Sequence, residues 1–260
     1  MNFAIVTPSF NQARFIKQTI KSVLTQSVKF KYWVMDGGST DQTVKILKSF
    51  GRQVNWVSHA DRGQTDAINQ GIARLKNNKK IISPQTIFAY LNSDDYYLPQ
   101  ALNQVAQVFT DHPEIQWLVG DALIVNEHNQ LIQPGVRLYK QLWRRFYLNW
   151  WLKILNPFPQ PATFVRWSAI QKTGLFNHRL HYVMDYEYWL KLQKKFGRPY
   201  FLHQPLAAFR IHHLSKSGSQ YIYQFAEQYQ IVRKFTRQPI VLWLHRIHSW
   251  LIVKIYQSIK

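Results

Sequence analysis

Short apolar runs alternate with polar turns and amphipathic segments along the first part of the chain. Four of these runs have the length and composition of buried strands: 3–7, 32–35, 54–57 and 87–90. Apolar residues recur at helical spacing in the segments between them: 13–26, about 40–50 and 66–75. Strands and helices that alternate in this way predict an α/β fold with a mostly parallel, doubly wound central sheet.

Polar side chains follow each predicted strand, and the clearest are Asp94 and Asp95 after the run 87–90. Ligands of open α/β sheets bind outside the carboxyl ends of strands, so this pair predicts a binding site. Adjacent carboxylates repel each other, and a hard cation such as Mg²⁺ or Mn²⁺ would keep both ionised and bring a phosphate group with it. A turn before the helix expected near Pro99 would use the same residue types.

Other predicted strands end in groups that suit a nucleotide. Phe10, Asp36 and the pair Asp61–Arg62 each follow a strand, so the fold would gather them on one edge of the sheet. An aromatic face can stack on a base, a carboxylate can accept from a ring N–H, and an arginine can neutralise a diphosphate. No Gly-x-Gly-x-x-Gly or Gly-Lys-Ser/Thr loop is present, which counts against the usual dinucleotide and P-loop sites.

Composition narrows the class of protein. The 260 residues are 46% hydrophobic, enough for a sizeable core, and include no cysteine, which excludes disulfides and thiolate metal sites. The N-terminus enters an apolar strand without a basic segment and a long apolar run, so we expect a cytosolic protein without a signal peptide. No apolar run of about 18 residues is present that would clearly span a membrane.

The charge is concentrated in the second half of the chain. Residues 1–136 carry 13 Lys and Arg against 10 Asp and Glu, whereas residues 137–260 carry 20 against 3. An excess of this size suits an anionic partner: nucleic acid, an acidic membrane or an anionic lipid-linked substrate. Nucleic-acid binding has only the charge in its favour, because no recognised motif accompanies it.

Two segments of this basic half combine apolar stripes with cations. The first, 139–158, is expected to be one aromatic and basic helix with Trp143 and Arg144 among its members. The second is an amphipathic tail with its stripe at 240–255. Helices of this composition lie in membrane interfaces, although packing on the core or on a second subunit would produce the same stripes. We expect contact with an anionic membrane surface.

A series of short motifs runs in order along the chain: TPSFNQ at 7–12, MDGGSTD at 35–41, DRGQ at 61–64 with DAINQG at 66–71, LNSDD at 91–95, GDA at 120–122, PQPATF at 159–164, MDYEYWL at 184–190 and FRIH at 209–212. This series resembles the family 2 glycosyltransferases of the GT-A fold. Each motif is weak alone, whereas the series in this order is specific. The resemblance covers roughly residues 3–217.

The resemblance implies a role for each matched position. Nucleotide-sugar binding would fall to Thr7, Pro8, Phe10, Asn11, Asp36, Gly38, Asp61, Arg62, Asp66, Asn92 and Asp94. Within this set, Phe10 would lie against the base and Asp36 would bind its ring edge. Asn92 departs from the first Asp of the family's Asp-x-Asp motif, which removes one possible metal ligand.

The remaining roles concern metal, base and acceptor. By the resemblance, Asp95 would hold Mg²⁺ or Mn²⁺, with Asp94 on the ribose or beside the metal, and His212 would reach the metal or the diphosphate. Asp185 would be the general base; an ordinary cap at the start of a helix is the alternative. A solvated basic loop is the alternative for His212. Two further matched residues would line the acceptor side: Asp121 and Gln160.

We therefore expect an inverting, metal-dependent glycosyltransferase that moves a sugar from a nucleoside-diphosphate sugar, a UDP-sugar above all, to a saccharide or lipid-linked acceptor. Cell-surface polysaccharide or glycolipid assembly would be its context, on the cytoplasmic face of the membrane. The expected organisation is a GT-A domain over 1–217 and a tail: nucleotide-binding half about 1–98, acceptor half about 99–217, tail 218–260. An inactive protein of this fold that binds nucleotide or membrane is the alternative.

Overall fold

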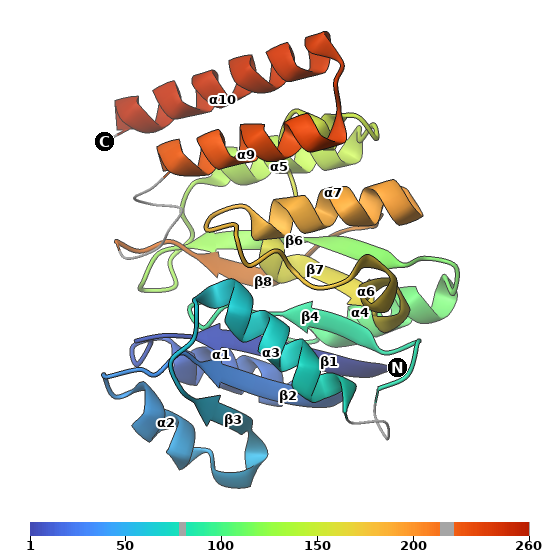
Figure 1. Ribbon diagram of the computed structural model, residues 1–260. Coiled ribbons are helices and arrows are strands. Elements are labelled where there is room, and N and C mark those ends of the chain that lie inside the picture. Colours follow the sequence, from blue (N-terminus) through green and yellow to red (C-terminus); the bar gives the residue numbers. More distant parts are fainter. Residues whose placement is uncertain (78–81, 214–220, 260) are drawn as a thin grey trace.

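A mixed sheet runs through the computed structural model, which describes residues 1–77, 82–213 and 221–259 (Figure 1). Its strand order is β3-β2-β1-β4-β7-β6-β8-β5. The strands are β1 (Asn2–Ser9), β2 (Lys29–Asp36), β3 (Asn55–Ser58), β4 (Ile87–Tyr90), β5 (Tyr96–Tyr97), β6 (Trp117–Val125), β7 (Thr163–Arg166) and β8 (Tyr200–Arg210).

Strand directions divide the sheet into two halves. The strands β3, β2, β1 and β4 are parallel, so their carboxyl ends meet at one edge. Beyond them β7 is antiparallel to both β4 and β6, and β5 is antiparallel to β8, while β6 and β8 are parallel. The predicted α/β fold is confirmed, and all four strands expected from the apolar runs form the parallel half.

Helices cover both faces of the sheet (Figure 1). They are α1 (Ile16–Leu24), α2 (Thr43–Ser49), α3 (Gln64–Lys76), α4 (Ala101–Asp111), α5 (Pro134–Arg145), α6 (Trp167–Thr173), α7 (Met184–Phe196), α9 (Tyr221–Phe235) and α10 (Pro239–Ile259). The described residues also form short 3-10 turns between these elements: η1 (Gly51–Gln53), η2 (Trp151–Lys153) and η3 (Gln160–Ala162).

Alternate side chains of β1 lie on opposite faces of the sheet and pack in two separate hydrophobic cores. Ala4 and Val6 belong to the core with α3, α6, α7 and α9, whereas Phe3 and Ile5 belong to the core with α1, α2 and α4. Because both faces are buried, the strand is a continuous apolar run in the sequence. Helix α3 approaches β1 closely at Gly71, where an added Cβ would lie 2.6 Å from a methyl carbon of Val6. This close packing places the start of α3 beside the end of β4.

The expectation of one helix over 139–158 is wrong. Helix α5 begins earlier, at Pro134, and ends at Arg145, and an irregular segment with η2 follows. The aromatic spacing suits a helix, but tertiary contacts override it. Tyr147 packs on Phe158 and Phe201 in the core that also contains α3, α6, α7 and α9, while Trp143 packs on Trp151. A single helix could not deliver these rings to such different neighbours.

The C-terminal segment is helical, as expected, and it is layered on the rest of the chain. Helix α9 contributes Ile231 and Val232 to the core shared with α3, α6 and α7. Helix α10 lies over α9 and α5 (Figure 1), and its Val241 packs with Ile154 and Leu155. The boundary expected at 217 falls within 214–220, outside the described residues.

Candidate functional site

The loop after β4 carries the two carboxylates that the sequence singles out, and they differ sharply. Asp95 is 1% exposed, and its carboxylate accepts a hydrogen bond of 2.8 Å from the backbone N–H of Arg210. The Asn92 amide is a second donor at 3.4 Å. Burial, and then the neighbouring Asp94, raise the pKa of the Asp95 carboxyl well above its usual range.

Asp94 is the carboxylate that is open toward the crevice. Its side chain is 20% exposed, and its Oδ2 lies 3.1 Å from Nε2 of His212. The Asp95 carboxylate is enclosed and already bonded to the backbone of β8, whereas Asp94 is the more accessible of the two. The assignment of the metal to Asp95 stays a prediction. The sequence placed Asp94 and His212 in supporting roles, and the fold brings these two together.

The pair Asp94 and His212 fits a divalent cation held jointly with a phosphate ligand. Adjacent ligands of an octahedral ion of this size lie about 3 Å apart, close to the separation of the two atoms. No group of three His, Cys, Asp or Glu side chains in the described part of the chain could enclose a metal. An ion here would need further ligands from the substrate, which is how Mg²⁺ sites with one or two carboxylates are usually completed.

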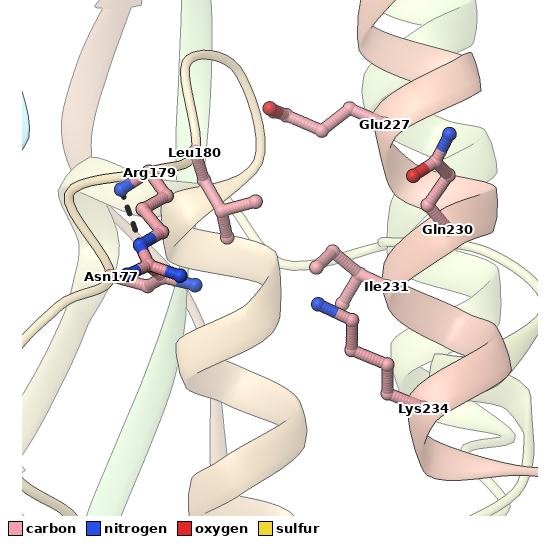
Figure 2. Close-up of a pocket in the computed structure, with 7 residues that line it drawn as sticks. All are labelled: Asn177, Arg179, Leu180, Glu227, Gln230, Ile231 and Lys234. Atoms are coloured by element: carbon pink, nitrogen blue, oxygen red, sulfur yellow. Dashed lines mark hydrogen bonds between the residues drawn. The ribbon is translucent and has the colours of Figure 1, made fainter.

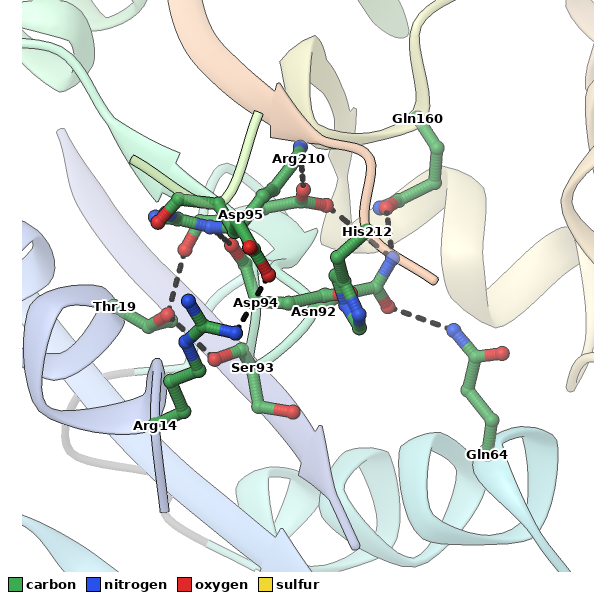
Figure 3. Close-up of polar contacts among 11 residues, drawn as sticks. Arg14, Thr19, Gln64, Asn92, Ser93, Asp94, Asp95, Gln160, Arg210 and His212 are labelled. Carbon is green, nitrogen blue, oxygen red and sulfur yellow. Dashed lines mark hydrogen bonds and ion pairs between the residues drawn. The ribbon is translucent and has the colours of Figure 1, made fainter. Parts of the chain in front are cut away.

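Arg210 locks this loop in place (Figure 3). It is 2% exposed, and its Nε donates to the carbonyl oxygen of Asp94 at 2.7 Å. On the other side of the loop, the Thr19 hydroxyl lies 2.6 Å and 2.8 Å from the carbonyl oxygens of Asp95 and Ser93. Arg210 is therefore a structural residue that braces the loop from β8, and its guanidinium is too enclosed to meet a diphosphate.

Asn92 joins the two halves of the site. Its side-chain oxygen accepts from Nε2 of Gln64 at 2.7 Å, and its amide nitrogen donates to Oε1 of Gln160 at 3.1 Å. Gln160 in turn donates to the carbonyl oxygen of Tyr90 at 2.8 Å. The position that lacks an Asp thus holds an amide that can donate and accept at once. Gln64, which the sequence placed in a motif without a role, completes the network.

The carboxyl ends of β1 and β2 carry Phe10, Asn11 and Asp36, three of the residues predicted to bind the nucleotide. Phe10 is 59% exposed, so its ring is available for stacking. Asp36 is 2% exposed and accepts three bonds, two from Ser39 and one of 2.6 Å from the Ser58 hydroxyl. Asn11 ties the two loops together, since its N–H donates to the Ser39 hydroxyl at 2.8 Å.

Asp61 lies beside Asp36 and is less enclosed. A Cβ added to Gly37 would be 3.0 Å from its carboxylate, and Gly38 has a φ of +84°, so both glycines leave room that a side chain would fill. Burial raises the pKa of Asp61, with further contributions from the charges of Asp66 and Asp36, while a hydrogen bond from the Gly63 N–H lowers it. A carboxyl of this kind is suited to a base edge.

Other residues of the predicted nucleotide set differ in exposure: Thr7 and Pro8 are buried, whereas the Arg62 side chain is 71% exposed. Thr7 is fully buried, and its Oγ accepts from the hydroxyl of Tyr32 at 3.0 Å; Pro8 is also buried. Their side chains support the core and do not face the crevice. Arg62 and Asp66 pair with each other at 3.1 Å, and this ion pair lowers the pKa of Asp66.

Asp185 lies in the first turn of α7, as the sequence predicts. It is half-buried, and its charge contributes, with that of Asp95, to the raised pKa of Tyr90, whose largest cause is burial. The preceding residue, Met184, contacts the hydroxyl of Thr65 at the start of α3. The start of α7 therefore contacts the start of α3, whose Gln64 bonds to Asn92.

The two residues expected on the acceptor side are engaged internally. Gln160 positions Asn92, as above. Asp121 is 3% exposed, and its carboxylate forms ion pairs with the guanidinium groups of Arg137, at 2.8 Å, and Arg144, at 2.6 Å. It also accepts a hydrogen bond from the side-chain amide of Gln141. Asp121 therefore anchors α5 to β6, and the expectation that its side chain lines the acceptor site is not supported by this geometry.

Comparisons of sequence agree with these features. Residues 4–164 match the sequence model of the family described as Glycosyl transferase family 2. An uncharacterized glycosyltransferase of Rickettsia typhi is 24% identical over 259 residues, which cover 95% of this chain and 77% of the relative. The minor teichoic acid biosynthesis protein GgaA of Bacillus subtilis is 24% identical over 218 residues, 75% of this chain and 44% of the relative.

Solved structures share the fold. TarS 1–349 of S. aureus, in complex with UDP-GlcNAc, superposes with a TM-score of 0.64 at 16% identity, over 90% of this chain and 71% of that one. A mannosyltransferase of Pyrobaculum calidifontis, in complex with GDP-Man and Mn²⁺, gives a TM-score of 0.69 at 12% identity, over 95% of this chain and 68% of the other. The sheet and its flanking helices are therefore those of the GT-A fold.

Proposed function

This chain belongs to glycosyltransferase family 2, and we propose that it is an inverting, metal-dependent enzyme. It would transfer a sugar from a nucleoside-diphosphate sugar, a UDP-sugar above all, to a hydroxyl of a saccharide or lipid-linked acceptor. The observation that carries the proposal is the pair Asp94 and His212, placed at the edge of the sheet that Asp36 and Asp61 also reach. The similarity to GgaA, a protein named for minor teichoic acid biosynthesis, supports a role in cell-surface polysaccharide or glycolipid assembly.

The donor would lie across the carboxyl ends of the parallel strands. Phe10 offers its exposed ring to the base, and Asp61, the less enclosed of the two carboxylates, would accept from the ring edge. Asp36 would order this end of the site through its bonds with Ser39 and Ser58. Asp94 and His212 would hold a divalent cation together with the diphosphate. Such a cation supplies positive charge against the charge that develops on the leaving group. Similar folds crystallised with UDP-GlcNAc, or with GDP-Man and Mn²⁺, support this placement.

Asp185 would act as the general base. Its place in the first turn of α7 favours the ionised carboxylate, because the helix dipole is positive there. The carboxylate would take the proton of the acceptor hydroxyl as that oxygen forms its bond to the anomeric carbon. The bond from that carbon to the diphosphate oxygen breaks on the opposite face, and the nucleoside diphosphate leaves with both electrons. A single displacement of this kind inverts the anomeric configuration.

An exposed apolar surface would bring the enzyme to its acceptor. We give the name outer surface to the exposed apolar residues of α5, α10 and the segment after α5, each at least 42% exposed: Leu138, Leu142, Phe146, Trp150, Ile240, Trp243, Trp250, Leu251 and Ile255. No helix in the described ranges combines the length and apolar character needed to cross a bilayer. We propose peripheral attachment to an anionic, cytoplasmic membrane face, which binding to lipid vesicles tests.

Calorimetric titration with UDP, with and without Mn²⁺, tests the metal assignment directly. In the wild type we expect Mn²⁺ to strengthen UDP binding. Asp94→Ala and His212→Ala should remove that gain, because each deletes one of the two proposed protein ligands. Asp111→Ala, which deletes an exposed carboxylate at the end of α4, is the matched control and should keep it. A gain of wild-type size in Asp94→Ala would overturn the assignment.

Turnover tests the reaction itself. Release of nucleoside diphosphate from UDP-glucose, UDP-N-acetylglucosamine and GDP-mannose identifies the donor, and NMR of the product's anomeric proton establishes whether configuration inverts. Asp185→Asn should bind UDP as the wild type does and turn over about 10²-fold more slowly or worse, the usual scale for a general base. Failure to turn over any donor would favour an inactive nucleotide- or membrane-binding protein.

A further inference from the structure

Helix α7 begins without a capping side chain of its own. The residue that precedes it, Val183, has no side-chain acceptor, and no side-chain hydrogen bond caps the helix there. The first helical bond runs from the N–H of Glu187 to the carbonyl oxygen of Val183 at 3.0 Å. Asp185 lies in this first turn, so its position depends on how the chain enters the helix.

A carboxylate from a distant helix holds that entry. Oε2 of Glu227, in α9, accepts from the N–H of Tyr182 at 2.8 Å and of Val183 at 3.1 Å, and Oε1 accepts from the N–H of His181 at 3.0 Å. Figure 2 shows Glu227 reaching from α9 toward the loop that leads into α7. Three consecutive N–H groups thus share one charged acceptor, which is a stronger and more directional hold than neutral bonds provide.

This contact is a charged link between α9 and the entry to α7. Glu227 is the one acidic residue between 188 and 260. On the opposite side of the turn, Met184 is 5% exposed and contacts Thr65 of α3. Met184, the residue before Asp185, is therefore held by α3, and residues 181–183 are held by Glu227 of α9.

We propose that Glu227 is a positioning residue for the reaction: through the backbone of 181–183, it sets where the Asp185 carboxylate stands relative to the donor. The inference rests on the proposed role of Asp185 as general base. Displacement of a catalytic group by about 1 Å can cost about 10²-fold in rate. Loss of the Glu227 carboxylate leaves the three backbone N–H groups of 181–183 without this acceptor. It does not alter the residues at the strand ends that are proposed to bind the nucleotide sugar.

The test compares Glu227→Ala and Glu227→Gln with the wild type and with Asp185→Asn. The measured quantities are kcat and KM for release of UDP from UDP-N-acetylglucosamine, or for whichever nucleotide sugar the wild type turns over. Glu227→Ala should lower kcat about 10- to 100-fold while KM for the donor and UDP affinity stay within about twofold. Glu227→Gln keeps one acceptor oxygen and should recover part of the loss, and it also decides the matter if the alanine variant does not fold.

Gln230→Ala is the matched control. Gln230 lies one turn along α9 from Glu227, and both residues line a pocket of about 410 Å³ between α9 and the loop before α7 (Figure 2). It should leave kcat unchanged. If Glu227 has only a structural role, Glu227→Ala should lower the melting temperature and leave kcat per folded molecule unchanged. That result, together with an inactive Asp185→Asn, would overturn the inference and leave the base assignment in place. Retained turnover in Asp185→Asn would instead overturn the base assignment, and the role of Glu227 would fall with it.

Discussion

At the scale of single residues, the carboxylates near the crevice differ in how much of their hydrogen-bonding capacity the protein already uses. Asp121 is surrounded by Arg137, Arg144 and an amide, and Asp95 accepts from the backbone of β8. Asp94 has its carbonyl held by Arg210 and its carboxylate turned toward His212. Chemistry with a ligand is therefore expected of Asp94, while the first two are expected to govern stability.

Asp121→Asn separates these roles. The substitution keeps the shape of the side chain and removes the charge that balances Arg144, which is 3% exposed. Removing one partner of a buried ion pair costs about 3–5 kcal/mol, so we expect a loss of unfolding free energy of that order. Urea denaturation measures it, with Asp111→Asn as an exposed control. If stability were unchanged and transfer to the acceptor lost, Asp121 would instead serve the acceptor.

Lys140 of α5 has a lowered pKa and interacts with the charge of Asp185. Burial, and then the charge of Arg144, lower the pKa of Lys140 to about 8, while Asp185 and Asp121 act in the opposite direction. The pairing of Arg144 with Asp121 and the placement of Lys140 near Asp185 join residues from α5, β6 and α7. Such contacts depend on packing between elements, and the sequence spacing of these residues gives no signal of them.

At the scale of elements, the sequence predicts what depends on local pattern. The four strands of the parallel half follow from apolar runs, and helix α7 follows from its spacing and carries Asp185 in its first turn as expected. The single helix expected over 139–158 does not form because Tyr147 and Phe158 pack in the core with α7, whereas Ile154 and Leu155 pack on Val241 of α10. The assignment of Asp95 to the metal stays a prediction, since the sequence does not show which of two adjacent carboxylates is enclosed by β8 and which lies against His212.

The contact between α5 and α10 contains a buried histidine with a consequence for pH. His248 bonds to the Tyr139 hydroxyl at 2.8 Å and stacks on its ring. Burial, and then the neighbouring His245, lower the pKa of His248 from 6.5 to about 4. Between these values the unfolded chain binds a proton that the folded chain excludes. Stability should therefore fall as pH drops from about 6.5 toward 4, by up to about 1.4 kcal/mol per pH unit.

Thermal melting across that pH window measures the effect. His248→Phe keeps a ring against Tyr139 and cannot be protonated, so its melting temperature should depend less on pH than that of the wild type. His178→Gln removes an exposed histidine and should leave the pH dependence unchanged. Equal pH dependence in His248→Phe and the wild type would show that another group controls acid stability.

At the scale of the whole molecule, charge and exposed apolar area coincide in the C-terminal half. The outer surface carries Trp243 at 60% and Trp250 at 58% exposure on α10, and Phe146 at 63% after α5. Exposed cations accompany it: Arg145, Arg246 and Lys254. Two residues of the expected membrane helix are excluded from this surface, because Trp143 packs on Trp151 and Arg144 is buried with Asp121.

We expect the outer surface to dock on anionic vesicles, with attraction from the cations and insertion of the indole rings. Each cation near an anionic leaflet contributes about 1 kcal/mol, and screening shortens its reach from about 10 Å at 0.1 M salt to about 3 Å at 1 M. Arg145→Gln, Arg246→Gln and Lys254→Gln together should therefore remove the salt-sensitive part of binding. Trp243→Ser with Trp250→Ser should remove the part that persists at high salt, because indole burial does not depend on screening.

Co-sedimentation with vesicles of graded anionic-lipid content measures both parts. Lys45→Gln with Lys48→Gln removes exposed cations of α2, in the nearly neutral half, and Leu175→Ser removes an exposed apolar side chain away from the outer surface. Both controls should sediment as the wild type does. If this face instead packs on a second copy of the chain, the tryptophan variants would lose a dimer in light scattering. Folded wild type that stays in the supernatant at low salt, on strongly anionic vesicles, would exclude membrane docking.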